Sequence, residues 1–469
     1  MSAGVTGRSG AVVVGGGIAG LAAARDLSIA GRQVLVLEGS ARLGGKIAGV
    51  RLGRSDLRID VGAESVLVRR PEAPALITSL GLDEQLVHPT SAKPRVFVDG
   101  RAVDVPPSAM GVPGDLEALA GLLSPAGLER ARQEPGLPAP PLVEDVAIGE
   151  LVDARFGPEV TDRLLEPLLG GVYAGHARRL SFAAVNASLY ERVRDGGPLS
   201  GHASVTRRPG DGPVFGGLVG GIAALVDALV ADLRSRGVEI RRGATVRVLA
   251  PDAGGYRLTV GPTRDAYDVV AESVVLATPA APTGRLLGEL VDSSAWLAAL
   301  PYASMAVVAL GVRGVEPEGS GLLVPPGQLP TIKAVTHSSN KWAWTQEATE
   351  RELGDGVQLV RASVGRLGEE HLLQLADDAL TERTVAELRR LPGWSGLDAV
   401  AGTVQRWGGG LPQYEVGHRD RVARLQTELL ARPGLAVCGA AYDGVGIAAC
   451  LGSAAAAVHK ITSDLDGRR

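Results

Sequence analysis

Three glycines and a glutamate near the start of the chain have the types and spacing of a dinucleotide-binding turn. Gly15, Gly17 and Gly20 follow one apolar run, and Glu38 ends the next. In such a turn the first glycine allows the bend, the second lets the backbone approach a pyrophosphate, and the third lets a helix pack closely on a strand. Glu38 stands where a carboxylate would accept the ribose hydroxyls. The alternative, a glycine-rich turn of an ordinary α/β domain, is disfavoured because every flanking element fits the dinucleotide motif.

A second glycine-rich turn, near the other end of the chain, indicates that the dinucleotide is a flavin. Gly444 and Gly446 precede an expected helix over residues 448–461. A helix N-terminus offers free N–H groups and a partial positive charge. A reduced isoalloxazine carries negative charge near N1 and O2, whereas a nicotinamide cofactor needs no second site of this kind. A surface helix with a glycine-rich start remains the alternative for this turn.

A strand–helix–strand unit is expected to position the first turn. Residues 11–14 and 33–37 are short, apolar and β-branched, which is typical of buried strands. Residues 18–30 carry apolar side chains at helical spacing, and Gly31 is a stop signal. Further strands are expected at 238–240, 244–250, 255–260, 273–280 and 304–312, and further helices at 71–80, 377–390 and 448–461.

The 469 residues exceed one ordinary core, so several domains are expected. Sequence patterns typical of a nucleotide-binding fold appear at the start of the chain, near residues 215–284 and at its end. The predicted fold class is therefore α/β, with a Rossmann-type FAD-binding domain assembled from separated segments, an α+β substrate-binding domain and a helical insert. The expected division is 1–85, 214–284 and 401–469 for the FAD-binding domain, 86–213 for the mainly helical insert and 285–400 for the substrate-binding domain. Residues 196–217, rich in Gly, Pro and Ser, are expected to form a long loop.

With 45% hydrophobic and 21% charged residues, the composition is that of a soluble globular protein. The net charge of −4 shows no basic excess, so no nucleic-acid partner is expected. Cys438 and Cys450 are too few for a disulfide framework and are expected to be buried thiols in a reducing compartment, so a cytoplasmic location is predicted. The uncharged stretch 293–312 is divided by Pro301 and is not expected to span a membrane. Peripheral membrane contact and a homodimer stay open.

Several longer motifs, spread over nearly the whole chain, carry a family resemblance. VVVGGGIAGLAAA (12–24) and RLGGK (42–46) are common to the monoamine oxidase and carotene desaturase superfamily. The stretches within DVGAESVLVRRPE (60–72), EPLLGGVYAG (166–175) and RWGGGLPQYEVGH (406–418) are more specific. With these motifs the sequence resembles the flavin-dependent porphyrinogen oxidases of haem biosynthesis, which include coproporphyrinogen III oxidases and protoporphyrinogen oxidases. It most resembles the branch from high-GC Gram-positive bacteria.

The resemblance implies FAD as the cofactor and names residues that would contact it. The glycines of the first turn would hold the diphosphate and Glu38 the ribose, Val246 would contact adenine through its backbone, and residues 445–447 would face the pyrimidine edge. Trp407 would pack near the flavin, with core packing as an equal alternative. The expected cofactor-binding residues are Gly15, Gly16, Gly17, Ile18, Ala19, Gly20, Glu38, Gly39, Arg42, Gly45, Lys46, Gly62, Ala63, Glu64, Val246, Trp407, Val445, Gly446 and Ile447.

The implied substrate is a porphyrinogen, a large apolar disc with propionates at its rim. It needs an apolar slot and cations at the edge. Arg69 and Arg70 follow the flavin-lining turn and are candidates, with a solvated basic pair as the alternative, and Lys341 is a weaker candidate. No catalytic side chain and no metal are expected, because the flavin carries the chemistry and no Ser–His–Asp or Cys–His signature stands out.

The predicted activity is oxidation of coproporphyrinogen III to coproporphyrin III in three two-electron steps, with dioxygen as acceptor and hydrogen peroxide as product. Alternatives are a protoporphyrinogen IX oxidase and a flavin amine oxidase. A non-enzymatic protein that extracts prenylated GTPases shares the architecture without flavin. It is disfavoured because such proteins do not keep an intact pyrophosphate turn together with a flavin-facing C-terminal helix start.

Overall fold

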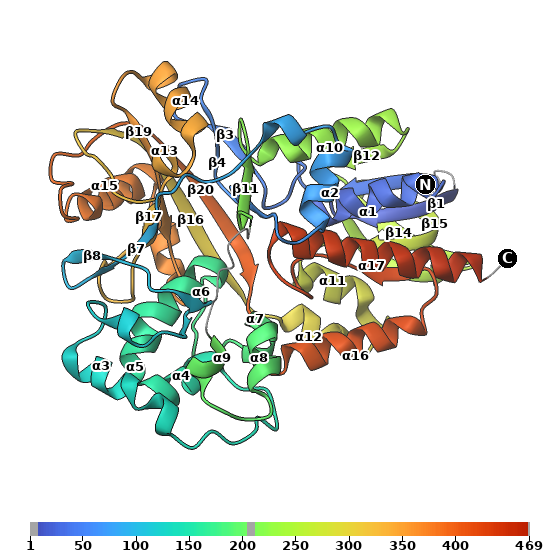
Figure 1. Cartoon of the computed structure of the whole chain (residues 1–469). Helices are drawn as coiled ribbons and strands as arrows, with labels where there is room; N and C mark the ends of the chain where they lie inside the picture. Colours follow the sequence, from blue (N-terminus) through green and yellow to red (C-terminus); the bar gives the residue numbers. More distant parts are fainter. Residues whose placement is uncertain (1–7, 204–211, 468–469) are drawn as a thin grey trace.

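A mostly parallel sheet forms one half of the computed structural model, which describes residues 8–203 and 212–467 (Figure 1). Its strands run in the order β12, β2, β1, β15, β14, β13, and β21 also pairs with β15. β1, β2, β12, β15 and β21 are parallel neighbours, whereas β13 and β14 add an antiparallel edge. The bounds are β1 Arg8–Val14, β2 Val34–Glu38, β12 Glu239–Arg242, β13 Val246–Asp252, β14 Gly255–Val260, β15 Tyr267–Leu276 and β21 Leu435–Val437.

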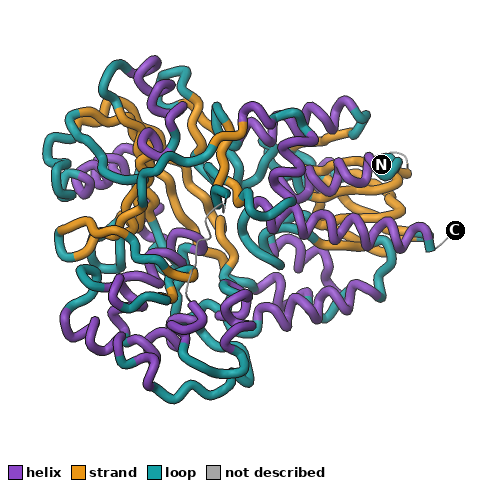
Figure 2. Tube along the Cα trace, viewed as in Figure 1, coloured by secondary structure: helices purple, strands orange, loops and turns teal. Residues whose placement is uncertain are grey.

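Helices cover both faces of this first sheet, as the alternation of its buried side chains requires (Figure 2). Val13 and Val36 pack in one core, and Val12 and Leu35 pack in the other. The first core holds α1 Ile18–Ile29, α2 Glu72–Ser79, α10 Ala223–Ser235 and α17 Ile447–Asp466. The second holds α11 Ala280–Leu287, α12 Ser294–Ala299 and α16 His418–Leu430.

The strand–helix–strand prediction for the N-terminus is confirmed, and so is the assembly of this sheet from separated segments. Two elements of this half end elsewhere than predicted. The strand expected over 273–280 stops at Leu276, because Pro279 precedes the first turn of α11 and the chain turns into that helix. Conversely, α17 continues to Asp466, five residues beyond the expected end at 461.

A second seven-stranded sheet forms the other half of the molecule, in the order β20, β16, β19, β18, β17, β7, β8. Helix α15, Asp377–Leu388, packs on one face of it. The bounds are β7 Pro94–Val98, β8 Arg101–Asp104, β16 Tyr302–Arg313, β17 Gly321–Leu323, β18 Ile332–His337, β19 Gln358–Val364 and β20 Asp398–Pro412. Residues 304–312 therefore form a strand, as predicted. β7 and β8 come from residues 86–213, which the sequence assigned to a mainly helical insert, and they join the sheet because β7 pairs with β17.

Short elements connect the two halves. They are β3 Gly49–Arg51, β4 Arg58–Asp60, β5 Val66–Leu67, β6 Leu86–Val87, β11 Phe215–Leu218, α13 Ser338–Lys341 and α14 Ala343–Leu353. β11 pairs with both β5 and β6, so the chain before and after the insert meets in one small sheet. The expected loop over 196–217 contains helix α9 and the start of β11, and its residues 204–211 lie outside the described part of the chain.

A cluster of helices lies beneath the second sheet, away from both termini (Figure 1). Its members are α3 Pro125–Arg132, α4 Ile148–Phe156, α5 Pro158–Val160, α6 Glu166–Tyr173, α7 Phe182–Val185, α8 Ala187–Val193 and α9 Leu199–Ala203, with β9 Ser108–Ala109 and β10 Val112–Pro113 beside them. Leucine, valine and phenylalanine side chains from these helices share one core with Val96 and Val98 of β7.

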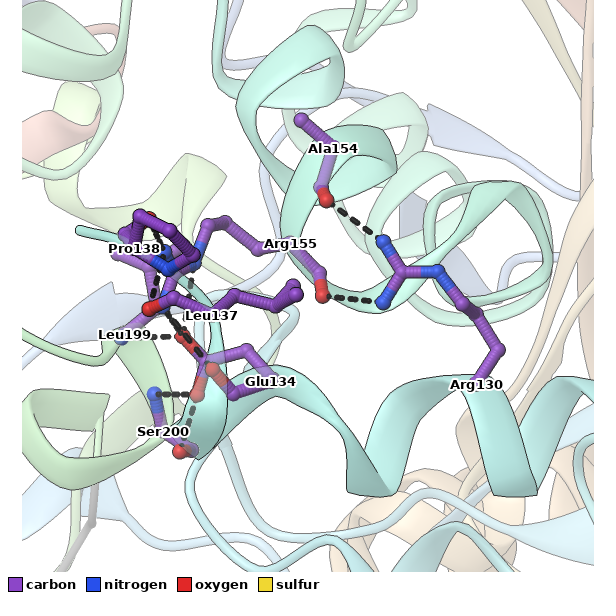
Figure 3. Close-up of polar contacts among 8 residues, drawn as sticks. All are labelled: Arg130, Glu134, Leu137, Pro138, Ala154, Arg155, Leu199 and Ser200. Carbon is purple, nitrogen blue, oxygen red and sulfur yellow. Dashed lines mark hydrogen bonds and ion pairs between the residues drawn. The ribbon is translucent and has the colours of Figure 1, made fainter.

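A buried ion pair ties this cluster together (Figure 3). Glu134 is fully buried, and its Oε1 accepts from Arg155 Nη2 at 2.5 Å and from Leu199 N at 2.7 Å. Arg155 also donates to the carbonyl of Pro138 at 2.6 Å. Arg130 donates to Ala154 and Arg155 carbonyls at the end of α4, where a cation is favoured. Each buried charge is thus satisfied by partners far apart in sequence.

Within the described ranges, no helix combines the length and the apolar composition needed to cross a bilayer. Cys438 and Cys450 are free and buried, as predicted.

We predict that Glu134→Ala destabilises the protein by about 3–5 kcal/mol, because Arg155 would remain buried without its carboxylate. Thermal unfolding followed by circular dichroism measures the loss. Glu129→Ala is the control, since Glu129 is exposed and its ion pair with Arg132 is a loose surface pair, with 3.9 Å between the charged atoms. Its unfolding midpoint should stay near that of the unmodified protein. Equal losses in both variants would contradict the role given to the buried pair.

Candidate functional site

A cavity of about 390 Å³ opens at the carboxyl ends of β1 and β2. This edge of a parallel sheet is where α/β proteins bind ligands. Its walls come mainly from the N-terminal turn with residues 44–47, from the stretch 244–246 with the end of β15, and from residues 439–450, and Ala63 and Tyr302 complete them. Twelve of the predicted cofactor-binding residues line it, namely Gly15, Gly17, Ile18, Ala19, Glu38, Gly39, Gly45, Lys46, Ala63, Val246, Val445 and Ile447.

The glycines of the first turn leave a space that a ligand's pyrophosphate would fit. Gly15 has φ +112°, and a Cβ there would lie 2.8 Å from the Ala277 carbonyl oxygen. A Cβ on Gly20 would lie 1.9 Å from the Gly15 carbonyl oxygen, so α1 packs directly on the turn. A Cβ on Gly17, the N-cap of α1, would meet only the Gly45 Cα at 3.9 Å. The protein therefore fills the space at Gly15 and Gly20 but leaves it open at Gly17.

Glu38 is held at the edge of this cradle by backbone donors. Its Oε2 accepts from Gly16 N at 2.6 Å, and its Oε1 accepts from Ser40 N at 2.7 Å. The carboxylate lines the cavity beside Gly39. Val246, at the start of β13, lines the same end together with Thr245. A carboxylate that can accept from ribose hydroxyls, next to the backbone of residues 245 and 246, is suited to bind an adenosine.

Lys46 and Tyr302 form the middle of the cavity wall. Lys46 Nζ lies 5.4 Å from the centroid of the Tyr302 ring, and burial lowers the pKa of Lys46. The Tyr302 hydroxyl accepts from Ala280 N at 3.0 Å, and burial raises the pKa of Tyr302 to about 12. Lys46 thus brings a poorly solvated cation to the cavity wall, and Tyr302 brings an aromatic ring.

Arg42 and Trp407 lie behind the cavity lining and hold it in place. Arg42 donates to the carbonyls of Leu43, Gly45 and Ile47, and its guanidinium lies 5.7 Å from the centroid of the Trp407 ring. Trp407 Nε1 donates to the Val61 carbonyl at 2.8 Å. These two side chains therefore shape the walls without lining the cavity. The other predicted cofactor-binding residues that do not line the cavity are Gly16, Gly20, Gly62, Glu64 and Gly446.

Glu64 sits between two cations of the second half of the molecule. Its Oε1 accepts from Lys341 Nζ at 2.5 Å, and Arg361 binds its other oxygen. Arg361 also donates to the Gly62 carbonyl at 2.8 Å. Burial of Glu64 acts to raise its pKa, but the two cations outweigh this and lower the pKa to about 2. Arg361, on β19, was not predicted from the sequence, because nothing local pairs it with a residue 297 positions away.

The three predicted substrate cations all have partners. Lys341 pairs with Glu64, Arg70 Nη2 lies 3.0 Å from Glu72 Oε1, and Arg69 Nη2 donates to the Gly212 carbonyl at 2.9 Å. None of them lines the cavity described above. Arg70 lies near the N-terminal part of α17, because a Cβ built on Gly452 would lie 3.3 Å from Oε1 of its partner Glu72.

The C-terminal turn supplies the last wall. Gly439, Ala440, Ala441 and Val445 line the cavity, and α17 begins at Ile447 with Gly446 as its N-cap. No heavy atom lies within 4 Å of a Cβ built on Gly439 or Gly446. A second helix N-terminus therefore faces the open space, as the sequence predicts.

The geometry agrees with comparisons to known proteins. The model of the family described as flavin containing amine oxidoreductase matches residues 18–462. The chain is 37% identical to a coproporphyrinogen III oxidase of Mycobacterium tuberculosis (strain ATCC 25618 / H37Rv), over 97% of this chain and 98% of that protein. It is 31% identical to the coproporphyrinogen III oxidase of Bacillus subtilis (strain 168), over 96% and 97%.

Solved structures are similar over the whole chain. A crystal structure of a protein from Exiguobacterium sp. 255-15 has a TM-score of 0.82 at 29% identity and covers 99% of this chain and 100% of that one. Reduced UDP-galactopyranose mutase has a TM-score of 0.73 at 18% identity, covers 97% and 96%, and supports the fold alone. The predicted resemblance and the predicted flavin cofactor are confirmed. The chain belongs to the family of flavin containing amine oxidoreductases.

Proposed function

We propose that the protein is a FAD-dependent coproporphyrinogen III oxidase that forms coproporphyrin III. The observation that carries the proposal is the 37% identity to the Mycobacterium tuberculosis oxidase, because it extends over 97% of the chain and includes the insert and the second sheet. A relative named protoporphyrinogen oxidase, from Macaca fascicularis, is 29% identical over 94% of the chain and supports protoporphyrinogen IX as the second candidate substrate.

FAD would lie along the cavity from β13 to α17. Gly15 and Gly17 would bring the α1 N-terminus to the diphosphate, and Glu38 would accept the ribose hydroxyls. Val246 would contact adenine. Lys46 and Ala63 would line the middle of the cofactor, and residues 445–447 would face its pyrimidine edge. The open space at Gly17 and Gly439, which both line the cavity and where a Cβ would meet almost nothing, supports this placement.

When bound, FAD would supply the redox chemistry by accepting a hydride from the macrocycle in each of three two-electron steps, with dioxygen as the final acceptor. The chain's own residues would hold the cofactor and orient the substrate against it. The N-terminus of α17 would stabilise negative charge at the pyrimidine edge. The two buried free thiols support a cytoplasmic location.

We predict that Gly17→Val yields a folded but colourless protein. A valine side chain would occupy the space beside Gly45 that the pyrophosphate needs, while the extended backbone at Gly17 tolerates it. Absorbance of the purified protein and its circular dichroism measure cofactor and fold. Gly136→Val is the control, because a Cβ there has no neighbour within 4 Å and the residue lies in the insert. Full FAD content in a folded Gly17→Val variant would mean that the cofactor lies elsewhere.

We predict that Arg70→Ala weakens turnover of coproporphyrinogen III more than that of protoporphyrinogen IX, by roughly ten- to hundredfold in kcat/KM. The tetracarboxylate has two more propionates than the dicarboxylate, and Arg70 pairs with Glu72 beside Gly452 of α17. Arg69→Ala tests the neighbouring cation in the same way. Arg51→Ala is the control, since Arg51 is exposed and pairs with Asp56 on the surface. Equal losses on both substrates, at normal FAD content, would remove Arg70 from substrate selection.

We predict that one hydrogen peroxide forms in each two-electron step and that turnover stops under nitrogen without an added acceptor. Peroxide and coproporphyrin measured together give the ratio. Undiminished anaerobic turnover would show that dioxygen is not the acceptor. Activity confined to protoporphyrinogen IX would favour the second candidate substrate.

A further inference from the structure

The segment LPQYEVGH, residues 411–418, touches the wall of the cavity from behind. Tyr414 is 1% exposed. Its hydroxyl donates to the Ala440 carbonyl at 2.6 Å and accepts from Gly444 N at 3.0 Å. A single phenol therefore joins both arms of the turn formed by residues 439–446, which we call the flavin turn. Burial raises the pKa of Tyr414, so the hydroxyl keeps the proton that it donates.

A second side chain of the same segment supports the flavin turn. The His418 ring stacks on Tyr414, with centroids 4.0 Å apart and 15° between the planes. His418 Nε2 lies 3.3 Å from the Tyr442 carbonyl oxygen. Burial lowers the pKa of His418 to about 4, so the ring is neutral near pH 7 and donates through Nε2 in the tautomer that this contact needs.

The flavin turn lies outside the helices and strands, since β21 ends at Val437 and α17 begins at Ile447. Residues 440–442 form a short hydrogen-bonded turn within it. Gly444 has φ +137°, a conformation that glycine adopts freely, so this residue does not by itself fix one backbone shape for the turn. The side chains of Tyr414 and His418 hold the backbone of the flavin turn, because they contact it at every second residue, 440, 442 and 444.

The same segment also holds the insert. Gln413 Nε2 donates to the Tyr173 carbonyl at the end of α6 at 2.8 Å, and the Tyr414 carbonyl accepts from Ser181 N at 2.7 Å. The Tyr173 and Tyr414 rings lie 5.5 Å apart. One short stretch thus connects the flavin turn to the helix that flanks the second sheet.

We propose that Tyr414 is a positioning residue for the flavin. Its hydroxyl fixes the flavin turn, and with it the N-terminus of α17, against the pyrimidine edge of the cofactor. This inference rests on the proposed placement of FAD in the cavity.

The test is Tyr414→Phe, which removes the hydroxyl and keeps the ring that stacks on His418. The Ala440 carbonyl and the Gly444 amide would lose their partner, so the Kd of the apoprotein for FAD should rise roughly ten- to hundredfold. The midpoint potential of the residual bound flavin should become more negative, because a displaced helix N-terminus stabilises negative charge less. Flavin fluorescence titration and spectroelectrochemistry measure the two effects.

Tyr256→Phe is the matched control. Tyr256 is buried on β14, and its hydroxyl donates to the Pro433 carbonyl at 3.1 Å, away from the cavity lining. This variant should keep the FAD Kd and the potential of the unmodified protein. A Tyr414→Phe protein with unchanged Kd and potential, or equal changes in both variants, would overturn the proposal.

Hydrogen exchange of the unmodified protein gives a second test that needs no variant. Adding FAD to the apoprotein should protect amides of both the flavin turn and residues 413–418. Protection of residues 15–20 without these two segments would overturn the role of Tyr414 but leave the cofactor site intact. No protection at residues 15–20 would instead overturn the placement of FAD, as would a yellow, folded Gly17→Val variant.

Discussion

The close approach of α1 to β1 is the constraint on which the cavity depends. A Cβ on Gly20 would lie 1.9 Å from the Gly15 carbonyl oxygen, so only a glycine allows the helix to start this near the strand end. That contact aims the N-terminus of α1 at the cavity and leaves Gly17 bare toward it. The other walls are then built to the same edge, because β2 and β15 flank β1 in the sheet and end there as well.

Charge pairing joins this edge to the second half of the molecule. Glu64 follows the turn that supplies Ala63 to the cavity, and Lys341 and Arg361 hold its carboxylate from the second sheet and the helix beside it. Arg361 is buried, and Glu64 and Lys341 are half-buried, so loss of one partner would leave the others unpaired in a poorly solvated place. The pairing explains why Lys341 is a structural cation rather than a free one. It also joins the turn after β4 to the second half of the molecule.

Buried hydroxyl and ring contacts complete the far wall. The segment that follows β20 carries Tyr414 and His418 to the flavin turn and Gln413 to the end of α6. The flavin turn and the helix that flanks the second sheet therefore both contact the same eight residues, 411–418.

Local signals in the sequence were sufficient to predict the first glycine turn and the strands and helix around it. The apolar runs, the helical spacing and the glycines of residues 11–38 predict β1, α1 and β2, because each feature acts on backbone within a few residues of itself. Glycines 444 and 446 likewise predict the start of α17. Family motifs added residues such as Val246, which carries no local signal and yet lines the cavity.

Contacts between distant residues were decided by the tertiary structure alone. Tyr302 and Cys450 line the cavity, Arg361 meets Glu64, and β7 leaves the insert to pair with β17, although no short pattern marks any of these. Arg69, Arg70 and Lys341 look alike in the sequence as basic residues near a motif, but each has a different partner in the fold. The physical reason is that glycine turns and hydrophobic periodicity act locally, whereas burial and charge pairing depend on which surfaces the folded chain brings together.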